Sequence, residues 1–369
     1  MGIKRMGKVQ PGYSPLFTVE IDACPIYEFL ISLDIVYDTY HGDETYDAGK
    51  AWFAALRSKV SADLRAAMRE LDALDFGAFG GHKVWSNLTG LAYSCPAPRD
   101  ISTFIEQVKA LTPLELLLIL SGYYLRGARR LILPDLILQA AQGNSEAQEQ
   151  LCAASPAWQE IVRVLFVADA AELKSRFVSL LTRWYVDVFR NLESQVVPLL
   201  MRDAQMKREL VPTMSSEHLI ETATNGLEFI PEPGNRKVLL IPSFTLRPWI
   251  ITTEYLDVKI FYYPIADEIV QQGHLPPAKL VRMYRALADE RRLRILRLLV
   301  QRDHISLQEV ADAVEVTKST AHHHLATLRT AGLVRVSDAD KGYSLRKEML
   351  PNVWKFLQGY LQLEIDPIA

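Results

Sequence analysis

Three consecutive histidines, His322 to His324, carry the most conspicuous chemistry of this chain, which contains eight histidines in all. Imidazole nitrogens are common ligands of transition metals, so a histidine run suggests a metal site. The same run can instead lie on a helix whose task is to meet another molecule. The geometry of that helix separates the two interpretations.

The spacing of the triplet argues against a metal site formed by these residues alone. Successive residues of an α-helix are about 100° apart, so adjacent histidines splay around the helix axis. Side chains that converge on one ion from a single helix must be three or four positions apart. Ala321, Leu325 and Leu328 mark the apolar face of the helix. On this helical wheel we expect His322 and His323 to face outward and His324 to turn toward the scaffold.

The segments before the triplet predict the first helix and the turn of a helix-turn-helix. Residues 306–314, "SLQEVADAV", begin with Ser306 and Glu309, which match the S-x-x-E capping box. The short turn "EVT" follows, and Thr317 is the expected cap of the second helix, "KSTAHHHLATLRTAG". "LVRV", the polar turn "SDADKG" and "YSLR" then predict a two-stranded hairpin, which completes a winged helix-turn-helix.

An earlier helix, "ADERRLRILRLLV", precedes this unit. Asp289 is its expected cap, and we expect Leu293, Leu296 and Val300 to lie together on its buried face.

Residues 280 to 363 resemble the ArsR/SmtB-like family of bacterial winged-helix repressors, through "RALADERRLRILRLL", "TKSTAHHHLATLRTAGLV" and the hairpin. The resemblance implies a homodimer formed through the outer helices, binding to a palindromic operator in double-stranded DNA, and loss of DNA affinity when an effector binds. Many members sense metals through a Cys-x-Cys pair on the first helix of the helix-turn-helix. That helix has no cysteine here, so metal sensing is not carried over.

We predict that DNA contacts come from the outward side of the second helix and from the wing. Recognition helices place their N-terminal residues against base edges, whereas basic wing residues reach the phosphate backbone. In the wing, we expect Gly342 to take the positive φ of the turn. The candidates are Lys318, Ser319, Thr320, His322, His323 and Arg329 on the helix, and Arg335, Lys341 and Tyr343 on the wing.

Charge and hydrophobic patterning predict two parts of different character. Residues 275–350 contain 14 Lys and Arg against 9 Asp and Glu, whereas the rest of the chain is net acidic. Residues 47–210 show mainly helical patterns, and residues 226–263 predict a short antiparallel sheet. "QQGHLPPAK", residues 271–279, is the best candidate for a linker.

The expected fold class is therefore mainly α with small β elements. We expect a regulatory domain over residues 1–270, the linker over 271–279, and a DNA-binding and dimerisation domain over 280–369.

The long N-terminal part is predicted to bind a small-molecule effector, apolar or aromatic in character. Its aromatic side chains are the candidates for such a pocket, although ordinary core packing is the simpler explanation of each one. The main candidates are Trp52, Trp85, Tyr123, Tyr124, Trp184 and Tyr185, with Phe53 and Trp249 as further aromatic residues.

Other functions of the N-terminal part stay open. It contains no nucleotide-binding, esterase or zinc-protease motif, so we expect no catalysis, although residues 76–85, "FGAFGGHKVW", are glycine-rich. Binding of a protein partner is one alternative. Metal or redox sensing is another, through residues without metal-ligand spacing: Cys24, His41, His82, Cys95 or Cys152. We expect no cofactor. The scattered cysteines and the absence of a membrane-length apolar run favour the cytoplasm.

Overall fold

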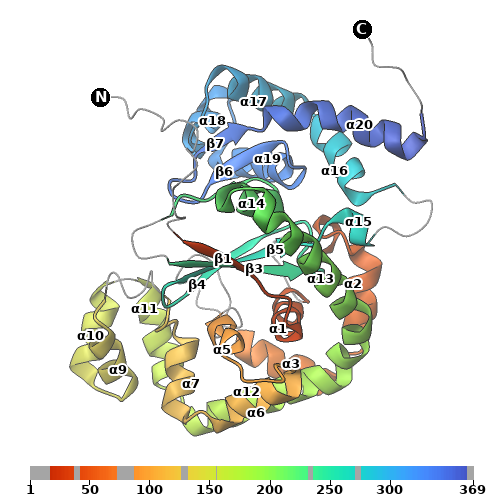
Figure 1. Ribbon diagram of the computed structural model, residues 1–369. Helices are drawn as coiled ribbons and strands as arrows, with labels where there is room; N and C mark the ends of the chain where they lie inside the picture. The colour runs from red at the N-terminus through yellow and green to blue at the C-terminus, as the bar shows by residue number, and fades with distance from the viewer. Residues whose placement is uncertain are drawn as a thin grey trace.

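Four strands form a mixed sheet between a lower layer of helices and the C-terminal module (Figure 1). This computed structural model describes residues 17–36, 42–72, 87–125, 132–154, 156–231, 236–270 and 276–363. The strands follow the order β1-β3-β5-β4, in which β1, β3 and β5 are parallel and β4 is antiparallel to β5. They are β1 (Thr18–Ile21), β3 (Lys237–Ser243), β4 (Ile251–Tyr255) and β5 (Val258–Pro264).

The mainly helical fold class with small β elements is confirmed, but the expected antiparallel pairing of the sheet is wrong for two of these three strand pairs. β3 and β5 are almost completely buried along their length. Continuous apolar runs of this kind are typical of parallel strands that are covered on both faces. The partner of β3 on one side is β1, which lies more than 200 residues earlier in the chain, so patterning within residues 226–263 does not reveal the pairing.

Helices from the first 210 residues surround the sheet. α1 and α13 contact β3, and α5 contacts β4. The helices are α1 (Pro25–Ile35), α2 (Gly49–Ser58), α3 (Ala62–Asp72), α5 (Thr89–Tyr93), α6 (Ile101–Ala110), α7 (Pro113–Leu120), α9 (Pro134–Ala141), α10 (Ser145–Ala154), α11 (Pro156–Ile161), α12 (Ala170–Trp184) and α13 (Arg190–Leu210). Short 3-10 segments span Asp43–Thr45 and Val211–Thr213, and π-helical turns at Val162–Phe166 and Tyr185–Phe189 extend α11 and connect α12 to α13.

The C-terminal module is a winged helix-turn-helix, as the sequence predicts. Side chains of Asp289, Ser306 and Thr317 cap the starts of α17, α18 and α19, and Ser306 forms the expected capping box with Glu309. The elements are α16 (Ala278–Leu287), α17 (Glu290–Gln301), α18 (Leu307–Ala313), α19 (Lys318–Thr330), β6 (Val334–Ser337), β7 (Tyr343–Leu345), a 3-10 turn (Lys347–Met349) and α20 (Leu350–Leu361).

The buried face of α17 differs from the expected one. Leu296 is buried, but Leu293 and Val300 are exposed, and Ile295 and Leu299 face the core instead. On the wheel, Ile295 and Leu299 lie on one side of Leu296, whereas Leu293 and Val300 lie on its other side, roughly 100° from the centre of the buried arc. Apolar side chains of α17 therefore remain at the surface.

The N-terminal part and the winged module share a sheet. α14 (Ser216–Ala223) leads into the short strand β2 (Leu227–Glu228), which pairs in parallel with β6 of the wing. The backbone amide of Asp338 also donates to the Glu228 carbonyl at 2.9 Å. The division of the chain at residues 271–279 stays a prediction, and residues 271–275 lie outside the described residues. β2 nevertheless connects the wing directly to the N-terminal part.

A buried ion network forms a second connection between the two parts. Asp267 of α15 (Asp267–Val270) pairs with Arg247, which follows β3, and its carboxylate lies 3.6 Å from Arg282 of α16. Asp47 pairs with Arg282 and lies 3.4 Å from Arg247. Two carboxylates thus alternate with two guanidinium groups, so every charge has a partner of the opposite sign.

No helix among the described residues is long and apolar enough to cross a membrane.

Candidate nucleic-acid interface

α19 presents one face to the core of the module and the other to solvent. Ala321, Leu325 and Leu328 are completely buried, and the hydroxyl of Thr317 accepts a hydrogen bond from the Thr320 amide at 3.2 Å. α18 packs against α19 in the arrangement that a helix-turn-helix requires. The cap and the apolar stripe together fix the rotation of α19 about its axis, and this rotation determines which of its side chains face solvent.

The histidine triplet divides as the helical wheel predicts. His322 and His323 are exposed, whereas His324 is only 6% exposed. The His324 Nδ1 atom lies 3.9 Å from a carboxylate oxygen of Asp289, the cap of α17. Burial lowers the pKa of His324, which favours the neutral ring at the core. Among the described residues, no group of three or more His, Cys, Asp or Glu side chains could hold a metal ion.

The first turn of α19 contains further predicted DNA contacts. Lys318 and Ser319 are exposed. Thr320 is partly buried, and its hydroxyl lies 2.8 Å from that of Thr317, so it contributes to the cap. Lys318, Ser319, His322 and His323 therefore form the outward face of α19, a term used below for these four residues. A contact between any of them and DNA stays a prediction.

Two predicted DNA contacts, Arg329 and Tyr343, point inward. Tyr343 is 8% exposed, and its backbone pairs with that of Ile305 in a β-bridge. Arg329 is half-buried close to Tyr343, and burial lowers the pKa of its guanidinium group. These side chains pack between α19 and the wing, which is unfavourable for the expected DNA contacts, and a contact of either with DNA stays a prediction. The sequence marks them as polar and near the site, but it does not reveal which face of the hairpin meets the helix.

Arg335, another predicted wing contact, forms ion pairs within the protein, and its contact with DNA stays a prediction. Its guanidinium group lies 2.6 Å from Glu221 of α14 and 3.3 Å from Glu348. Arg346 lies 3.3 Å from the same Glu221 carboxylate, and it donates to Asn225 and to the Gly332 carbonyl. The role of Arg335 in docking the wing onto α14 went unpredicted, because Glu221 lies more than 100 residues earlier in the chain.

The tip of the wing keeps Lys341 at the surface. Lys341 is 68% exposed and lies 3.1 Å from Asp338. The turn differs from expectation, because Lys341 itself has φ of +58° and Gly342 does not have a positive φ. A Cβ atom on Gly342 would lie 2.5 Å from the His304 ring, so this glycine is required for close packing. His304 in turn lies 2.6 Å from Asp340, and this hydrogen bond contributes most to lowering the pKa of Asp340 to about 2.

Replacing Lys341 with Ala should weaken binding to all DNA sequences alike. A wing lysine that contacts phosphate adds about one ion to the salt dependence, so the slope of log K against log [salt] should fall by about one. Fluorescence anisotropy with specific and random duplexes over a range of salt concentrations measures both quantities. An unaltered slope would exclude the contact.

The predicted effector residues are scattered over several packing clusters. Trp184 is buried and its indole donates to the Ser32 hydroxyl at 3.3 Å, while Trp52 packs against Phe53 and Phe244. Tyr185 packs against Phe29, and Tyr123 packs against Tyr124. Phe53 is buried and Trp249 is half-buried. The described aromatic residues therefore do not meet in one cluster, and core packing accounts for most of them. Binding of an effector by any of them stays a prediction. Trp85, His41 and His82 lie outside the described residues.

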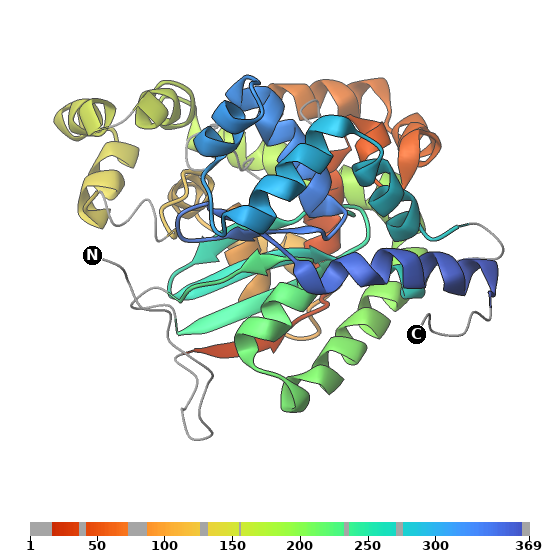
Figure 2. The same ribbon diagram turned by 90° about the horizontal axis from the view of Figure 1, so that it is seen from above.

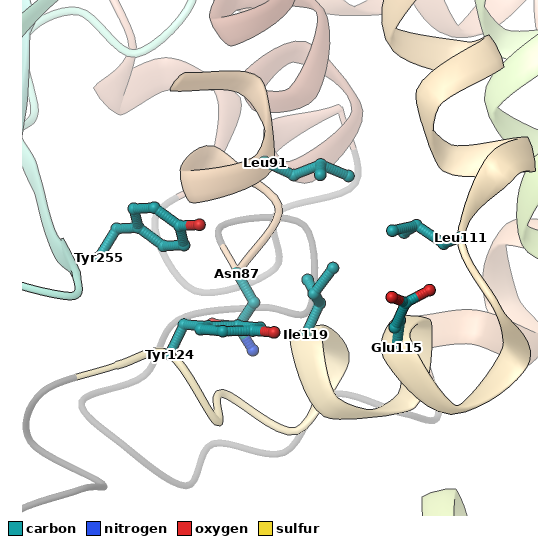
Figure 3. Close-up of a pocket in the computed structure, with 7 residues that line it drawn as sticks. All are labelled: Asn87, Leu91, Leu111, Glu115, Ile119, Tyr124 and Tyr255. Carbon is teal, nitrogen blue, oxygen red and sulfur yellow. The ribbon is translucent and has the colours of Figure 1, made fainter. Parts of the chain in front are cut away.

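A cavity of about 110 Å³ does lie beside one of the predicted residues, Tyr124 (Figure 3). α5, α7 and β4 contribute to its walls. Its lining residues are Asn87, Leu91, Leu111, Glu115, Ile119, Tyr124 and Tyr255. The sequence provides no spacing signal for this set, because the residues come from segments that meet only in the folded chain.

Comparisons with known proteins place the helix-turn-helix in a family. Residues 287–337 match the family model described as a helix-turn-helix domain, which is ArsR-like. The chain is 37% identical over 83 residues to the uncharacterized HTH-type transcriptional regulator YceK of Bacillus subtilis. That alignment covers 22% of this chain and 80% of YceK. No solved structure matches the chain.

Proposed function

Because this chain belongs, through its C-terminal module, to the ArsR-like HTH-type transcriptional regulators, we propose that it is a homodimeric repressor whose N-terminal part senses a small molecule. DNA binding through the helix-turn-helix is the property of the family, and the outward face of α19 carries the proposal. Four polar side chains project from a capped helix whose opposite face is buried in the module. Purified protein should therefore select a specific sequence from a pool of random duplexes.

Ser319, His322 and His323 are proposed to read base edges in the major groove. A hydroxyl and an imidazole can each donate or accept a hydrogen bond, which suits them to the donor and acceptor pattern of the groove. Lys318, in the first turn, carries a positive charge and can only donate hydrogen bonds. Its proposed partner is a phosphate. Lys341 at the tip of the wing would reach a second phosphate.

Replacing His323 with Ala should relax the sequence preference of DNA binding. Loss of a good base contact reduces discrimination by about 1–3 kcal/mol, whereas phosphate contacts are retained. The measurement compares the affinities for the selected operator and for a random duplex. His324→Ala cannot serve as the control, because His324 is buried. A suitable control is Gln308→Ala, because Gln308 is exposed on α18. If His323→Ala leaves the ratio of the two affinities unchanged, His323 does not read a base.

The outer helices provide a surface for the proposed dimer. Leu350, Trp354 and Leu361 are exposed apolar side chains spaced along one side of α20, and Tyr284 is exposed on α16. Figures 1 and 2 show α20 at the outside of the molecule, away from the central sheet. Exposed apolar surface of this kind is typical of protein interfaces. A second copy of the chain is the proposed occupant, because two recognition helices are needed to read a palindromic site.

Replacing Trp354 with Asp should weaken this dimer by at least about tenfold, since a charge then enters an apolar contact. Light scattering over a range of concentrations measures the change in mass. Val186→Asp is a matched control, because Val186 is about equally exposed but lies between α12 and α13. A wild-type protein that is monomeric at all concentrations and still binds a palindromic operator contradicts the proposed dimer.

The N-terminal part is proposed as the sensor, because its contacts with the DNA-binding module are extensive. β2 pairs with the wing, Glu221 binds two wing arginines, and Asp47 and Asp267 bind the first helix of the module. A ligand that shifts these contacts changes the relative stability of DNA-competent and DNA-incompetent states. The test is release of DNA by small molecules retained on the purified protein and identified by mass spectrometry.

A further inference from the structure

The cavity between α5, α7 and β4 combines aromatic, anionic and apolar walls. On this basis we propose that it binds a small organic cation with one aromatic ring, such as an arylalkylammonium ion. The inference rests on the proposed sensing function of the N-terminal part and specifies the chemical class of its effector. The cavity of about 110 Å³ holds at most one ring, since it is smaller than the engineered apolar cavities of about 150 Å³ that hold benzene.

Two tyrosines form the aromatic side of the cavity. The ring centroids of Tyr124 and Tyr255 are 5.8 Å apart, and the rings are inclined at 48°. The Leu256 amide donates to the Tyr124 carbonyl at 3.0 Å, which ties the loop after α7 to the end of β4. Gly90 lies directly against Tyr255, because a Cβ atom at this position would come within 1.9 Å of the ring. The tyrosine faces are therefore held in place, and aromatic faces attract cations.

Glu115 supplies the negative charge. Its Oε2 atom accepts hydrogen bonds from the amide and the hydroxyl of Thr112 in the capping box of α7. These hydrogen bonds lower the pKa of Glu115, so its carboxylate is ionised at neutral pH. Figure 3 shows Glu115 and Leu111 across the cavity from Tyr124 and Tyr255. A positively charged group can therefore approach the carboxylate while its ring lies against the tyrosines.

The remaining lining residues favour a cation over an anion. Leu91, Leu111 and Ile119 are apolar, and the Asn87 amide donates to the Leu120 carbonyl at 2.9 Å. Lys174 interacts electrostatically with Glu115, and its ammonium group donates to the carbonyl groups of Lys109 and Leu111. None of the described residues that line the cavity is a lysine or an arginine. Among these residues, an anionic ligand would meet the Glu115 charge without a compensating cation.

Two ion pairs connect the strand that carries Tyr255 to the wing. Tyr255 follows Glu254 on β4, and Glu254 lies 3.4 Å from Lys259 on the neighbouring strand β5. Lys259 lies 3.0 Å from Asp338 at the base of the wing turn, and the two side chains are nearly buried. A shift of the β4–β5 hairpin on ligand binding would therefore move the partner of a wing residue. Lys259 is the proposed link between the cavity and the DNA-binding surface.

Isothermal titration with benzylamine tests the site, with benzyl alcohol and benzoate as the neutral and anionic probes of the same size. Benzylamine should bind at least about tenfold more tightly than either. The Glu115→Gln variant should remove this preference, because glutamine is compatible with the capping box but carries no charge. Circular dichroism on thermal unfolding verifies that the variant folds. Absence of benzylamine binding, equal binding of the neutral probe, or an unchanged preference in Glu115→Gln overturns the proposed site.

Fluorescence anisotropy with operator DNA tests the connection to the wing. Saturating benzylamine should change the operator affinity of the wild-type protein at least about threefold, and Lys259→Met should abolish this change while benzylamine still binds. If benzylamine binds without changing DNA affinity, or if Lys259→Met retains the change, the connection is overturned. A protein that binds benzylamine but selects no DNA sequence contradicts the proposed function and leaves the cation site supported. A protein that binds its operator but not benzylamine contradicts the cation site and leaves the proposed DNA-binding function supported.

Discussion

Replacing Asp267 with Ala should lower the free energy of unfolding by about 3–5 kcal/mol, the usual range for removal of one partner from a buried ion pair. Arg247 is only 5% exposed and pairs with Asp267, while Arg282 lies 3.6 Å from the same carboxylate. Asp267 also accepts a hydrogen bond from the backbone amide of Lys279 at the start of α16. Without it, two largely buried guanidinium groups share Asp47 alone, and one positive charge is left uncompensated. Urea unfolding followed by circular dichroism measures the loss.

Glu172→Ala is the control for this variant. It removes the partner of Arg176 in an i,i+4 ion pair whose two side chains are largely exposed, so little change in stability is expected. The comparison separates burial from the mere loss of an ion pair. Equal stability of Asp267→Ala and Glu172→Ala would mean that water already solvates the network at Asp267, contrary to its burial in the structure.

Replacing Glu221 with Ala should lower the free energy of unfolding by about 2–3 kcal/mol and loosen the wing. Glu221 is the carboxylate shared by Arg335 and Arg346, and Arg346 is only 9% exposed. Burial lowers the pKa of Arg346, and the nearby carboxylates of Glu221 and Glu348 oppose this shift. After the substitution, Arg346 retains only the more distant Glu348 as an anionic partner. Hydrogen exchange at β6 and β7 should become faster, since α14 no longer binds the two arginines of the wing.

Glu348→Ala provides the matched control, because Glu348 contacts the same two arginines from the solvent side. It is 56% exposed and lies 3.3 Å from Arg335 and 3.5 Å from Arg346. An exposed partner of this kind contributes under about 1 kcal/mol. If the two variants are equally stable and exchange alike, Glu221 does not anchor the wing, and β2 pairing alone must account for its position.

The elements of the DNA-binding module could be predicted because their signals are local. A capping box such as Ser306 with Glu309 spans four residues, and the positions of Ala321, Leu325 and Leu328 within one helix decide which face is buried. The opposite directions of His323 and His324 follow from the same periodicity. The helical wheel needs no knowledge of the rest of the chain to separate them.

The wing shows where such local reasoning ends. Arg335 and Tyr343 look like surface residues of a basic hairpin, but a hairpin has two faces and its pattern alone does not assign them. Glu221, which binds Arg335, comes from α14, and β2 covers the strand edge that the hairpin would otherwise expose. A module attached to a different N-terminal part could leave the same arginine free for DNA.

The central sheet and the cavity depend on contacts between segments far apart in the chain. β1 pairs with β3 across more than 200 residues, and Tyr255 of β4 contacts Gly90 and Tyr124, which come from much earlier segments of the chain. Helix periodicity, caps and turn chemistry act over a few residues, so the recognition helix and the division of its histidines were decided locally. Strand order, docking of the wing and the walls of the cavity were decided by tertiary packing. The contacts that stabilise them are with residues far away in the chain, which local sequence patterns do not identify.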